Sequence, residues 1–413
     1  MTGNAEQEKV NAVYIPQSII LTKDSGLSRN FALAPSEEVQ QFYEQGKFGD
    51  YDFHTVFYDI FLSDDRPEIL AVGPPFVNLE QHLLPAKITI DSRDYPLKKK
   101  IQTDRGVIYS AKIPPELHQT VEACRDTISK VVFANGMEYI FELQPALFKK
   151  PHGKLLTTQQ HNNEIRWIKD WIRYYRKAFG VEHVVLYSNN SDLYQQEINE
   201  LASSKVTIVR WNFPFGLSGR NEAKFYKNRF SQVGQLHHCQ MRFANRTNAM
   251  FNFDNDELLV CKSKSVRKRI NKGEYLLFDS YWVPTRPNLP EDFSYVDFSQ
   301  RLTESRLASK PNLYVTKGII SGKSQFVWVS PHSANWFGPV LVKLIQKMIK
   351  GLRTIMRIKR SNQIPVQDAY FLHYSGISTK WKLAFGEKDE RHSLDHMETC
   401  TDLSVIEVLG KKP

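Results

Sequence analysis

Two aspartates, Asp254 and Asp256, carry the clearest chemical signal in this sequence. They follow the strand-like residues 250–253 and precede a second apolar run at 258–260. Side chains two residues apart on an extended backbone point the same way, so the two carboxylates are expected to converge on one cation. Oxygen ligands suit Mg²⁺ or Mn²⁺, which keep open positions for the phosphates of a ligand. A solvated acidic turn is the alternative interpretation.

Strand and helix patterns alternate ahead of this pair, at residues 154–157, 162–180, 181–187, 193–201 and 206–211. This order predicts a parallel sheet with right-handed crossovers. Open parallel sheets bind ligands beyond the carboxyl ends of their strands, where helices begin. The loops that contain Asn163, Glu164 and Asp192 follow such strand ends. We therefore expect these loops to line a ligand site.

The part of the chain before residue 150 has a different pattern. Residues 51–150 contain short β segments separated by turn residues, which is typical of an antiparallel sandwich or small barrel. Asn135-Gly136 is the sharpest hairpin signal. The predicted fold class is α/β, with a leader at 1–50 that is partly irregular. A β-rich, sandwich-like accessory domain follows at 51–150, and a Rossmann-type sheet domain at 151–413.

The composition excludes several classes of protein. The 413 residues carry a formal charge of +10 and are 41% hydrophobic, which provides the apolar area that a folded core requires. No apolar run approaches the ~20 residues needed to cross a bilayer, and the polar N-terminus lacks the apolar stretch of a signal peptide. The four cysteines form no CxxC pair, so neither a disulfide framework nor a thiolate zinc site is indicated. We therefore expect a cytoplasmic protein.

Four segments, taken together, point to a known family. They are the helix start at Asn163-Glu164, GVEHVVLYSNNSD at 180–192, FDNDELL at 253–259 and FLHY at 371–374. Over about residues 155–381, the sequence resembles glycosyltransferase family 92. The resemblance implies a GT-A fold, a nucleotide-sugar donor such as a UDP-sugar, and a Mn²⁺ or Mg²⁺ ion.

The resemblance also implies roles for individual residues. By position, it implies metal contacts from Asp254, Asp256 and His373. It implies that the loops of Asn163, Glu164 and Asp192 line the nucleotide site.

Two further residues, Lys317 and His332, follow the aspartates in an order that resembles the family's lysine and histidine. Lys317 is expected to contact the donor and His332 to take a catalytic role. The alternatives are a solvated lysine and a hydrogen-bonded histidine at the end of a strand.

An inverting transfer needs a general base within hydrogen-bond reach of the acceptor hydroxyl. The candidates are the carboxylates Glu257, Asp297, Glu304 and Asp368. Asp368 stands five residues before His373, a spacing that we interpret as keeping it near the site. The resemblance favours inversion, and a retaining mechanism stays open.

Aromatic side chains commonly hold sugar rings by stacking. The available tryptophans are Trp211, Trp282, Trp328, Trp336 and Trp381. We expect Trp336 and Trp381 to be the first candidates for this role, with core packing as the alternative for each.

Basic segments suggest anionic partners. Residues 339–360 read as a basic amphipathic helix that could contact a membrane surface, or pack on the sheet with a solvated basic edge. Residues 98–100 and 262–272 could contact the phosphates of a nucleic acid, but zinc-finger spacing and RNP-type motifs are missing from the sequence. No nucleic-acid partner is therefore expected. Another alternative is a non-catalytic carbohydrate-binding protein.

The sequence thus predicts an enzyme of the hexosyltransferase type. It would transfer a sugar from a nucleotide-sugar donor to a glycan or lipid-linked saccharide acceptor, as in polysaccharide biosynthesis. The protein would be cytoplasmic, with peripheral membrane contact through residues 339–360.

Overall fold

The chain forms two compact units in the computed structural model. The described residues are 12–30, 51–123, 127–143, 152–189, 194–216, 229–285, 289–304, 315–337, 362–377 and 397–410. The first unit consists of Met1–Lys150, Tyr187–Asn190 and Asn199–Asn245. The second consists of Pro151–Leu186, Ser191–Ile198 and Arg246–Pro413. Both units are therefore discontinuous in sequence, and the predicted domain borders stay a prediction.

The first unit contains a seven-stranded antiparallel sheet in the order β10-β9-β6-β7-β8-β5-β4. Its strands are β4 (Asp59–Leu62), β5 (Glu68–Gly73), β6 (Ala86–Ile90), β7 (Arg93–Gln102), β8 (Val107–Lys112), β9 (Thr127–Val132) and β10 (Glu138–Leu143). The long strand β7 pairs with β6 through its first half and with β8 through its second, and an irregularity separates Lys99 from Ile101. Such bulges bend a strand, which lets one sheet enclose a core.

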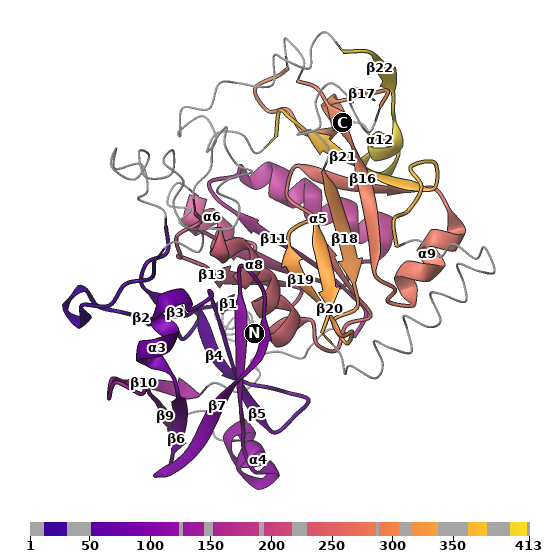
Figure 1. The fold of residues 1–413 in the computed structure, drawn as a ribbon. Coiled ribbons are helices and arrows are strands. Elements are labelled where there is room, and N and C mark those ends of the chain that lie inside the picture. The colour runs from indigo at the N-terminus through magenta and orange to yellow at the C-terminus, as the bar shows by residue number, and fades with distance from the viewer. Residues whose placement is uncertain are drawn as a thin grey trace, which may run out of the picture. The chain divides into compact units, whose positions relative to one another are not determined.

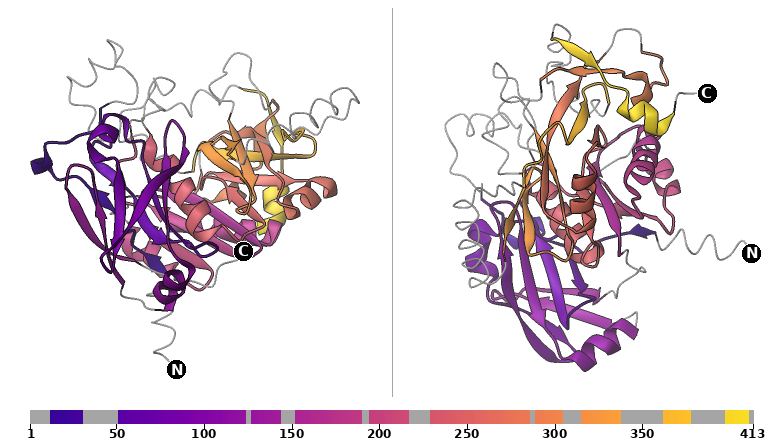
Figure 2. Two further views of the ribbon diagram at one scale, coloured as in Figure 1. Left: turned by 60° about the horizontal axis from the view of Figure 1, so that its bottom comes forward. Right: turned by 90° about the vertical axis from the view of Figure 1, so that its right-hand side faces the viewer.

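This sheet, drawn in indigo to magenta in Figures 1 and 2, buries a continuous apolar cluster. The cluster draws on side chains such as Val56, Ile88 and Val131, each 0% exposed. The predicted hairpin joins β9 to β10, and Gly136 takes the positive φ of 85° that its turn requires. The β-rich character of this region is thus confirmed.

Shorter elements complete the first unit. They are β1 (Val13–Tyr14), β2 (Ile19–Ile20), η1 (Lys23–Ser25), β3 (Thr55–Phe57), η2 (Val77–Leu79), α3 (Glu80–Leu83), α4 (Pro115–Ala123), β13 (Val206–Arg210), α8 (Phe230–His238) and the π-helical turn η5 (Cys239–Phe243). Strand β1 pairs in parallel with β13, and the Tyr14 side chain is buried. The described part of the leader is therefore packed into this unit.

The second unit is built on a mixed sheet in the order β12-β11-β14-β18-β16-β21-β15. The strands are β11 (Lys154–Gln160), β12 (His183–Ser188, whose last two residues belong to the first unit), β14 (Ala249–Asn252), β15 (Glu257–Cys261), β16 (Leu276–Val283), β18 (Thr316–Ile320) and β21 (Ala369–Tyr374). Strand β11 pairs in parallel with β14, and β16 with β21. Strand β18 is antiparallel to both of its neighbours, and β15 is antiparallel to β21.

Helix α5 (Ile165–Phe179) supports this sheet through one apolar face. Its buried residues follow the 3.6-residue period of an amphipathic helix and include Ile168, Trp171 and Tyr175. The helix ends at Gly180, whose φ of 66° forms the left-handed cap that glycine adopts most readily. The hydroxyl of Tyr175 donates to the Glu257 carbonyl at 3.0 Å, which ties the helix to the start of β15.

The remaining elements of the second unit are α6 (Gln195–Glu200, whose last two residues belong to the first unit), α9 (Lys264–Asn271), η6 (Tyr295–Asp297), β17 (Gln300–Leu302), β19 (Phe326–Ser330), β20 (Ser333–Trp336), β22 (Thr399–Thr401) and α12 (Ser404–Leu409). The predicted α/β class is thus confirmed, but the sheet is mixed rather than parallel, because β15 and β18 are antiparallel to their neighbours. No helix among the described residues is both long and apolar enough to cross a membrane.

Candidate functional site

The candidate site lies at one edge of the mixed sheet. Strands β11 and β14 run in parallel, with Thr157 opposite Asn252. Their carboxyl ends therefore emerge at the same edge, which brings the loop after β11 towards the turn after β14. This turn carries Asp254 and Asp256, so the structure places both aspartates at a strand end, as the sequence predicts.

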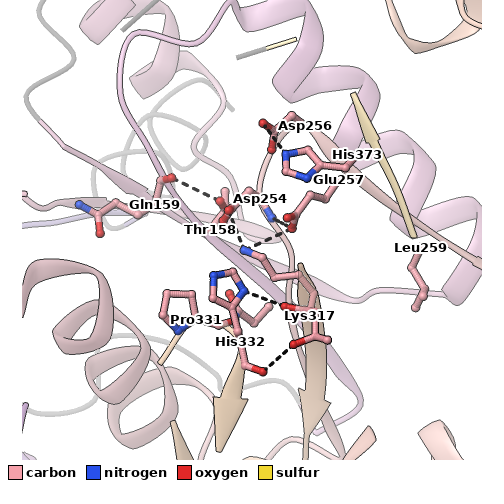
Figure 3. Close-up of polar contacts among 12 residues, drawn as sticks. Thr158, Gln159, Asp254, Asp256, Glu257, Leu259, Lys317, Pro331, His332 and His373 are labelled. Atoms are coloured by element: carbon pink, nitrogen blue, oxygen red, sulfur yellow. Dashed lines mark hydrogen bonds and ion pairs between the residues drawn. The ribbon is translucent and has the colours of Figure 1, made fainter. Parts of the chain in front are cut away.

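Three side chains converge at this edge: Asp256, Glu257 and His373. Each offers one ligand atom, and these atoms lie within 4.8 Å of one another. The Nε2 atom of His373 is 3.4 Å from Oδ2 of Asp256 (Figure 3). The antiparallel pairing of β15 and β21 sets Glu257 opposite His373, which explains why residues more than a hundred positions apart meet. All three residues are buried.

Asp254 has a different partner. Its Oδ2 atom accepts a hydrogen bond from Nζ of Lys317 at 2.6 Å, and the same Nζ is 3.3 Å from Oε2 of Glu257 (Figure 3). The Asp254 side chain is 38% exposed, whereas Lys317 is 0% exposed. The expected extended backbone is wrong here, because the chain turns: the amide of Glu257 donates to the Asp254 carbonyl at 3.0 Å. Alternation of side chains does not hold through a turn.

The electrostatics of the site follow from its burial. Burial raises the pKa of Glu257 well above its usual value, and the carboxylates of Asp254 and Asp256 act in the same direction against the lowering effect of Lys317. Burial alone would lower the pKa of Lys317, but Asp254 and Glu257 more than offset this and raise it. Lys317 is thus a charged ammonium inside the protein.

Backbone contacts hold the turn in place. The amide of Asp254 donates to Oε2 of Glu257 at 2.8 Å, and the Asp256 carbonyl accepts from the amide of Tyr374 at 2.8 Å. The hydroxyl of Tyr295 donates to the carbonyl of Asn255. The acidic side chains are therefore presented by a backbone that is bonded on both sides, unlike that of a solvated acidic turn.

Trp282 stacks on the imidazole of His373. The two ring centroids are 3.9 Å apart, and the ring planes make an angle of 20°. The parallel pairing of β16 and β21 sets these residues opposite each other. Within the described part of the chain, Nδ1 of His373 is buried and has no hydrogen-bond partner, so the indole face is a major constraint on the ring. No sequence signal distinguishes Trp282 from the other tryptophans, because its contact depends on strand order.

His332 is exposed in the turn between β19 and β20. Its Nδ1 atom lies 2.7 Å from the carbonyl oxygen of Thr316, the residue before Lys317. The Thr316 hydroxyl donates in return to the His332 carbonyl at 3.1 Å. These contacts place His332 beside the strand that carries Lys317 (Figure 3), and its catalytic role stays a prediction.

The residues predicted to line the nucleotide site lie partly within the described chain. Asn163 is buried, and its amide donates to Oε1 of Gln160 at 3.4 Å. Glu164 precedes helix α5, and its carboxylate is 2.6 Å from the guanidinium of Arg166. Asp192 lies outside the described residues. The contact of these loops with a nucleotide stays a prediction.

The expected proximity of Asp368 to the site is wrong. Strand β21 is extended, and its first residue, Ala369, pairs with Cys261 at the far end of β15. At ~3.3 Å per residue, five residues of strand separate Asp368 from His373 by about 16 Å. The Asp368 carbonyl instead accepts hydrogen bonds from the amides of Lys262 and Ser263.

Two other base candidates, Asp297 and Glu304, do not belong to the three-residue cluster. The Asp297 carboxylate accepts a hydrogen bond from the amide of Ser294 at 2.7 Å and so caps η6. Glu304 is exposed. Glu257 is the candidate that the structure brings into the cluster.

The remaining tryptophans have different surroundings. Trp211 is 0% exposed and packs among Tyr58, Tyr187 and His238 in the first unit. Trp328 is 0% exposed, and Trp336 is half-buried with its ring edge-to-face against Phe326. Trp381 and the basic segment 339–360 lie outside the described residues.

The donor set fits a divalent cation such as Mn²⁺. Two carboxylates and one imidazole are ligands that Mn²⁺ accepts, and carboxylates also suit Mg²⁺. Among the described residues, Nδ1 of His373 has no hydrogen-bond partner, so no carbonyl or carboxylate there fixes the tautomer of the ring. The observed set differs from the predicted one, because Glu257 joins Asp256 and His373, whereas Asp254 adjoins the cluster through Lys317.

Comparisons with known proteins place this site in a family. No curated protein matches the sequence significantly. One solved structure with some similarity is the type III pullulan hydrolase from Thermococcus kodakarensis, at 12% identity and a TM-score of 0.15. The match covers 32% of this chain and 31% of that protein, so the chain spans less than a third of its length, and a TM-score this low does not support a shared fold. The model of glycosyltransferase family 92 matches residues 157–404, which contain the whole cluster. The chain belongs to glycosyltransferase family 92.

Proposed function

We propose that this protein is a metal-dependent glycosyltransferase of the hexosyltransferase type. It transfers a sugar from a nucleotide-sugar donor, a UDP-sugar in the first instance, to a glycan or a lipid-linked saccharide. Membership of glycosyltransferase family 92 supports the class of reaction, glycosyl transfer. The buried cluster at the sheet edge supports the metal dependence, because carboxylates and an imidazole converge there.

The single observation that carries the proposal is the convergence of Asp256, Glu257 and His373 within 4.8 Å. These residues would hold the divalent cation. When bound, that cation supplies positive charge for the diphosphate that leaves the sugar. The chain itself holds the ligands rigidly through the bonded turn and the ring of Trp282, so little reorganisation accompanies transfer.

We further propose a GT-A-like arrangement for the second unit. The position of the acidic turn after β14, next to the end of the parallel strand β11, supports it, since open sheets bind nucleotides at such edges. The loop of Asn163 and Glu164 follows β11 and is our candidate for the nucleotide contact.

Inversion at the anomeric carbon is part of the proposal. The bond of Glu257 Oε2 to the Asp254 amide, its contact with Lys317 and its place in the three-residue cluster favour metal holding over proton abstraction for this carboxylate. The general base would therefore come from another residue or from the acceptor site. Nuclear magnetic resonance of the product's anomeric proton tests inversion directly.

The decisive experiment measures release of nucleoside diphosphate from a panel of nucleotide sugars, with Mn²⁺ or with a chelator. We expect turnover with one donor, its loss on chelation, and a decrease of about 100-fold or more in the Asp256→Ala variant. The Glu116→Ala variant, changed at an exposed acid of α4, serves as the control and should keep full activity. Absence of turnover with every donor, together with salt-sensitive binding of duplex nucleic acid, would favour a binding protein instead.

A further inference from the structure

Lys317 is an unusual neighbour for a metal site. Its side chain is 0% exposed, and its ammonium lies between Asp254 and Glu257, at 2.6 Å and 3.3 Å. Glu257 therefore faces two kinds of positive partner: the internal ammonium, and any cation that binds with Asp256 and His373. The sequence predicts that this lysine contacts the donor; that contact stays a prediction, and the ammonium is enclosed by protein here.

The position of this ammonium has a consequence for the ion-free protein. Several carboxylates close together in a buried site repel one another and lose hydration, and both effects destabilise the folded state. Lys317 compensates part of this charge from within β18, the strand next to β14. The folded state should thus be stable without a divalent cation, unlike a site whose folding requires its metal.

The same ammonium must also affect ion binding. A fixed positive charge beside a divalent cation raises the electrostatic free energy of the bound state, most strongly where water is excluded. The ammonium also draws electron density from Glu257, which belongs to both groups. Both effects weaken ion binding relative to the same acids, in the same ionised state, without a lysine.

We propose that Lys317 is the built-in counter-cation of this metal site, which stabilises Asp254 and Glu257 when the ion is absent and limits the affinity for the ion when it binds. This inference rests on the proposed function, because it takes the cluster of Asp256, Glu257 and His373 as the metal site. Lys317 is a positioning residue here, since it acts through the carboxylates.

Calorimetric titration of the chelator-treated chain with MnCl₂ tests this inference without any substrate. The Lys317→Met variant removes the charge but keeps an unbranched side chain. We expect it to bind Mn²⁺ about tenfold or more tightly than the wild type. Without ions its melting temperature should be lower, and Mn²⁺ should raise that temperature more than in the wild type. The Lys323→Met variant, changed at an exposed lysine after the same strand, is the matched control and should bind like the wild type.

The outcomes separate this inference from the proposed function. If the wild type binds Mn²⁺ and Lys317→Met binds it equally or more weakly, the counter-cation role is overturned and the metal site stands. If neither protein binds Mn²⁺, Mg²⁺ or Ca²⁺, the metal dependence fails and this inference fails with it. If only the variant binds, the inference is supported in its strongest form.

A second variant keeps the test decisive if Lys317→Met does not fold. The double variant Lys317→Met/Asp254→Asn removes the ammonium and one acid together, so the net charge of the group is unchanged. We expect it to fold without ions and to bind Mn²⁺ within about threefold of the wild type, because the two electrostatic changes oppose each other. Binding more than about tenfold weaker would show that Lys317 and Asp254 support the ion, and would overturn the inference.

Discussion

Two buried acids, Asp59 in the first unit and Glu257 in the second, show how differently a protein can treat an enclosed carboxylate. Both are at most 1% exposed. Asp59 accepts hydrogen bonds from the Tyr14 hydroxyl at 2.7 Å, the Gln17 amide at 2.7 Å and Nε2 of His238 at 2.8 Å. Glu257 instead lies among other carboxylates, with one ammonium shared with Asp254.

The pKa directions of these two acids are opposite. Burial would raise the pKa of Asp59, but the hydrogen bond and charge of His238, together with Arg242 and Tyr14, lower it below the usual value. Burial raises the pKa of Glu257, and its acidic neighbours add to this effect. A saturated network indicates a structural role, whereas an excess of carboxylates indicates a place for a cation. Burial alone thus does not mark a functional acid.

The largest expected effect is on folding. The Asp59→Asn variant leaves His238, Tyr14 and the nearby Arg242 without their shared anion. We expect the free energy of unfolding to fall by about 3–5 kcal/mol, as when one partner of a buried ionic network is removed. Urea unfolding measures it, with the exposed Asp24→Asn as control. A loss below about 1 kcal/mol would contradict a structural role for this network.

The Asp256→Asn variant should lose ion binding rather than folded stability. Without ions, its free energy of unfolding should stay within about 1 kcal/mol of the wild type, because loss of the contact with His373 is offset by less repulsion from Glu257. With Mn²⁺, the rise in melting temperature should disappear, because a ligand is lost. If Asp256→Asn were strongly destabilised in the absence of ions, the acidic cluster would have a structural role like that of Asp59, and the contrast between the two regions would not hold.

The Trp282→Leu variant tests how the metal site orients one of its ligands. Loss of the stacked indole frees the ring of His373, and we expect Mn²⁺ affinity to fall by about tenfold, as for residues that orient a metal ligand. Trp336→Leu is the matched control, because this half-buried tryptophan contacts Phe326 rather than a cluster residue. Equal affinities in the two variants would show that the stacking does not orient the histidine.

The smallest effect concerns acid stability. The folded pKa of Asp59 lies below its reference value of 3.8, so this carboxylate contributes stability that is complete above about pH 5 and is lost as the pH falls through the folded pKa. Between pH 5.5 and 3.5, the wild type should lose about 0.5 kcal/mol more of its unfolding free energy than Asp59→Asn does. Urea titrations at several pH values measure this slope, and parallel slopes would contradict the lowered pKa.

Local patterns predicted most of the elements correctly. The hairpin at Asn135-Gly136, the strand β6 and the helix ending at Gly180 all follow from short-range rules, because turn residues and periodic apolar positions act within a few residues. The alternating strands and helices likewise predicted the α/β class, but they predicted a parallel sheet, whereas β15 and β18 are antiparallel to their neighbours. These rules did not reveal that both units are discontinuous, since that depends on contacts between distant segments.

The same local rules predicted the candidate site only in part. The sequence singled out Asp254, Asp256 and His373, and the structure brings the last two together with Glu257. The rule of alternating side chains failed because the backbone turns between Asp254 and Glu257. Asp368 was misplaced for the opposite reason, since five residues of extended strand cover a long distance.

The sequence by itself determined the types of side chain available and the local elements that carry them, because propensity and periodicity are properties of neighbouring residues. The tertiary structure alone decided which acid meets which cation. Lys317 lies beside Asp254, and Trp282 on His373, only because β18, β16 and β21 take adjacent places in the sheet. Strand order depends on burial across the whole unit, and no short stretch of sequence contains that information.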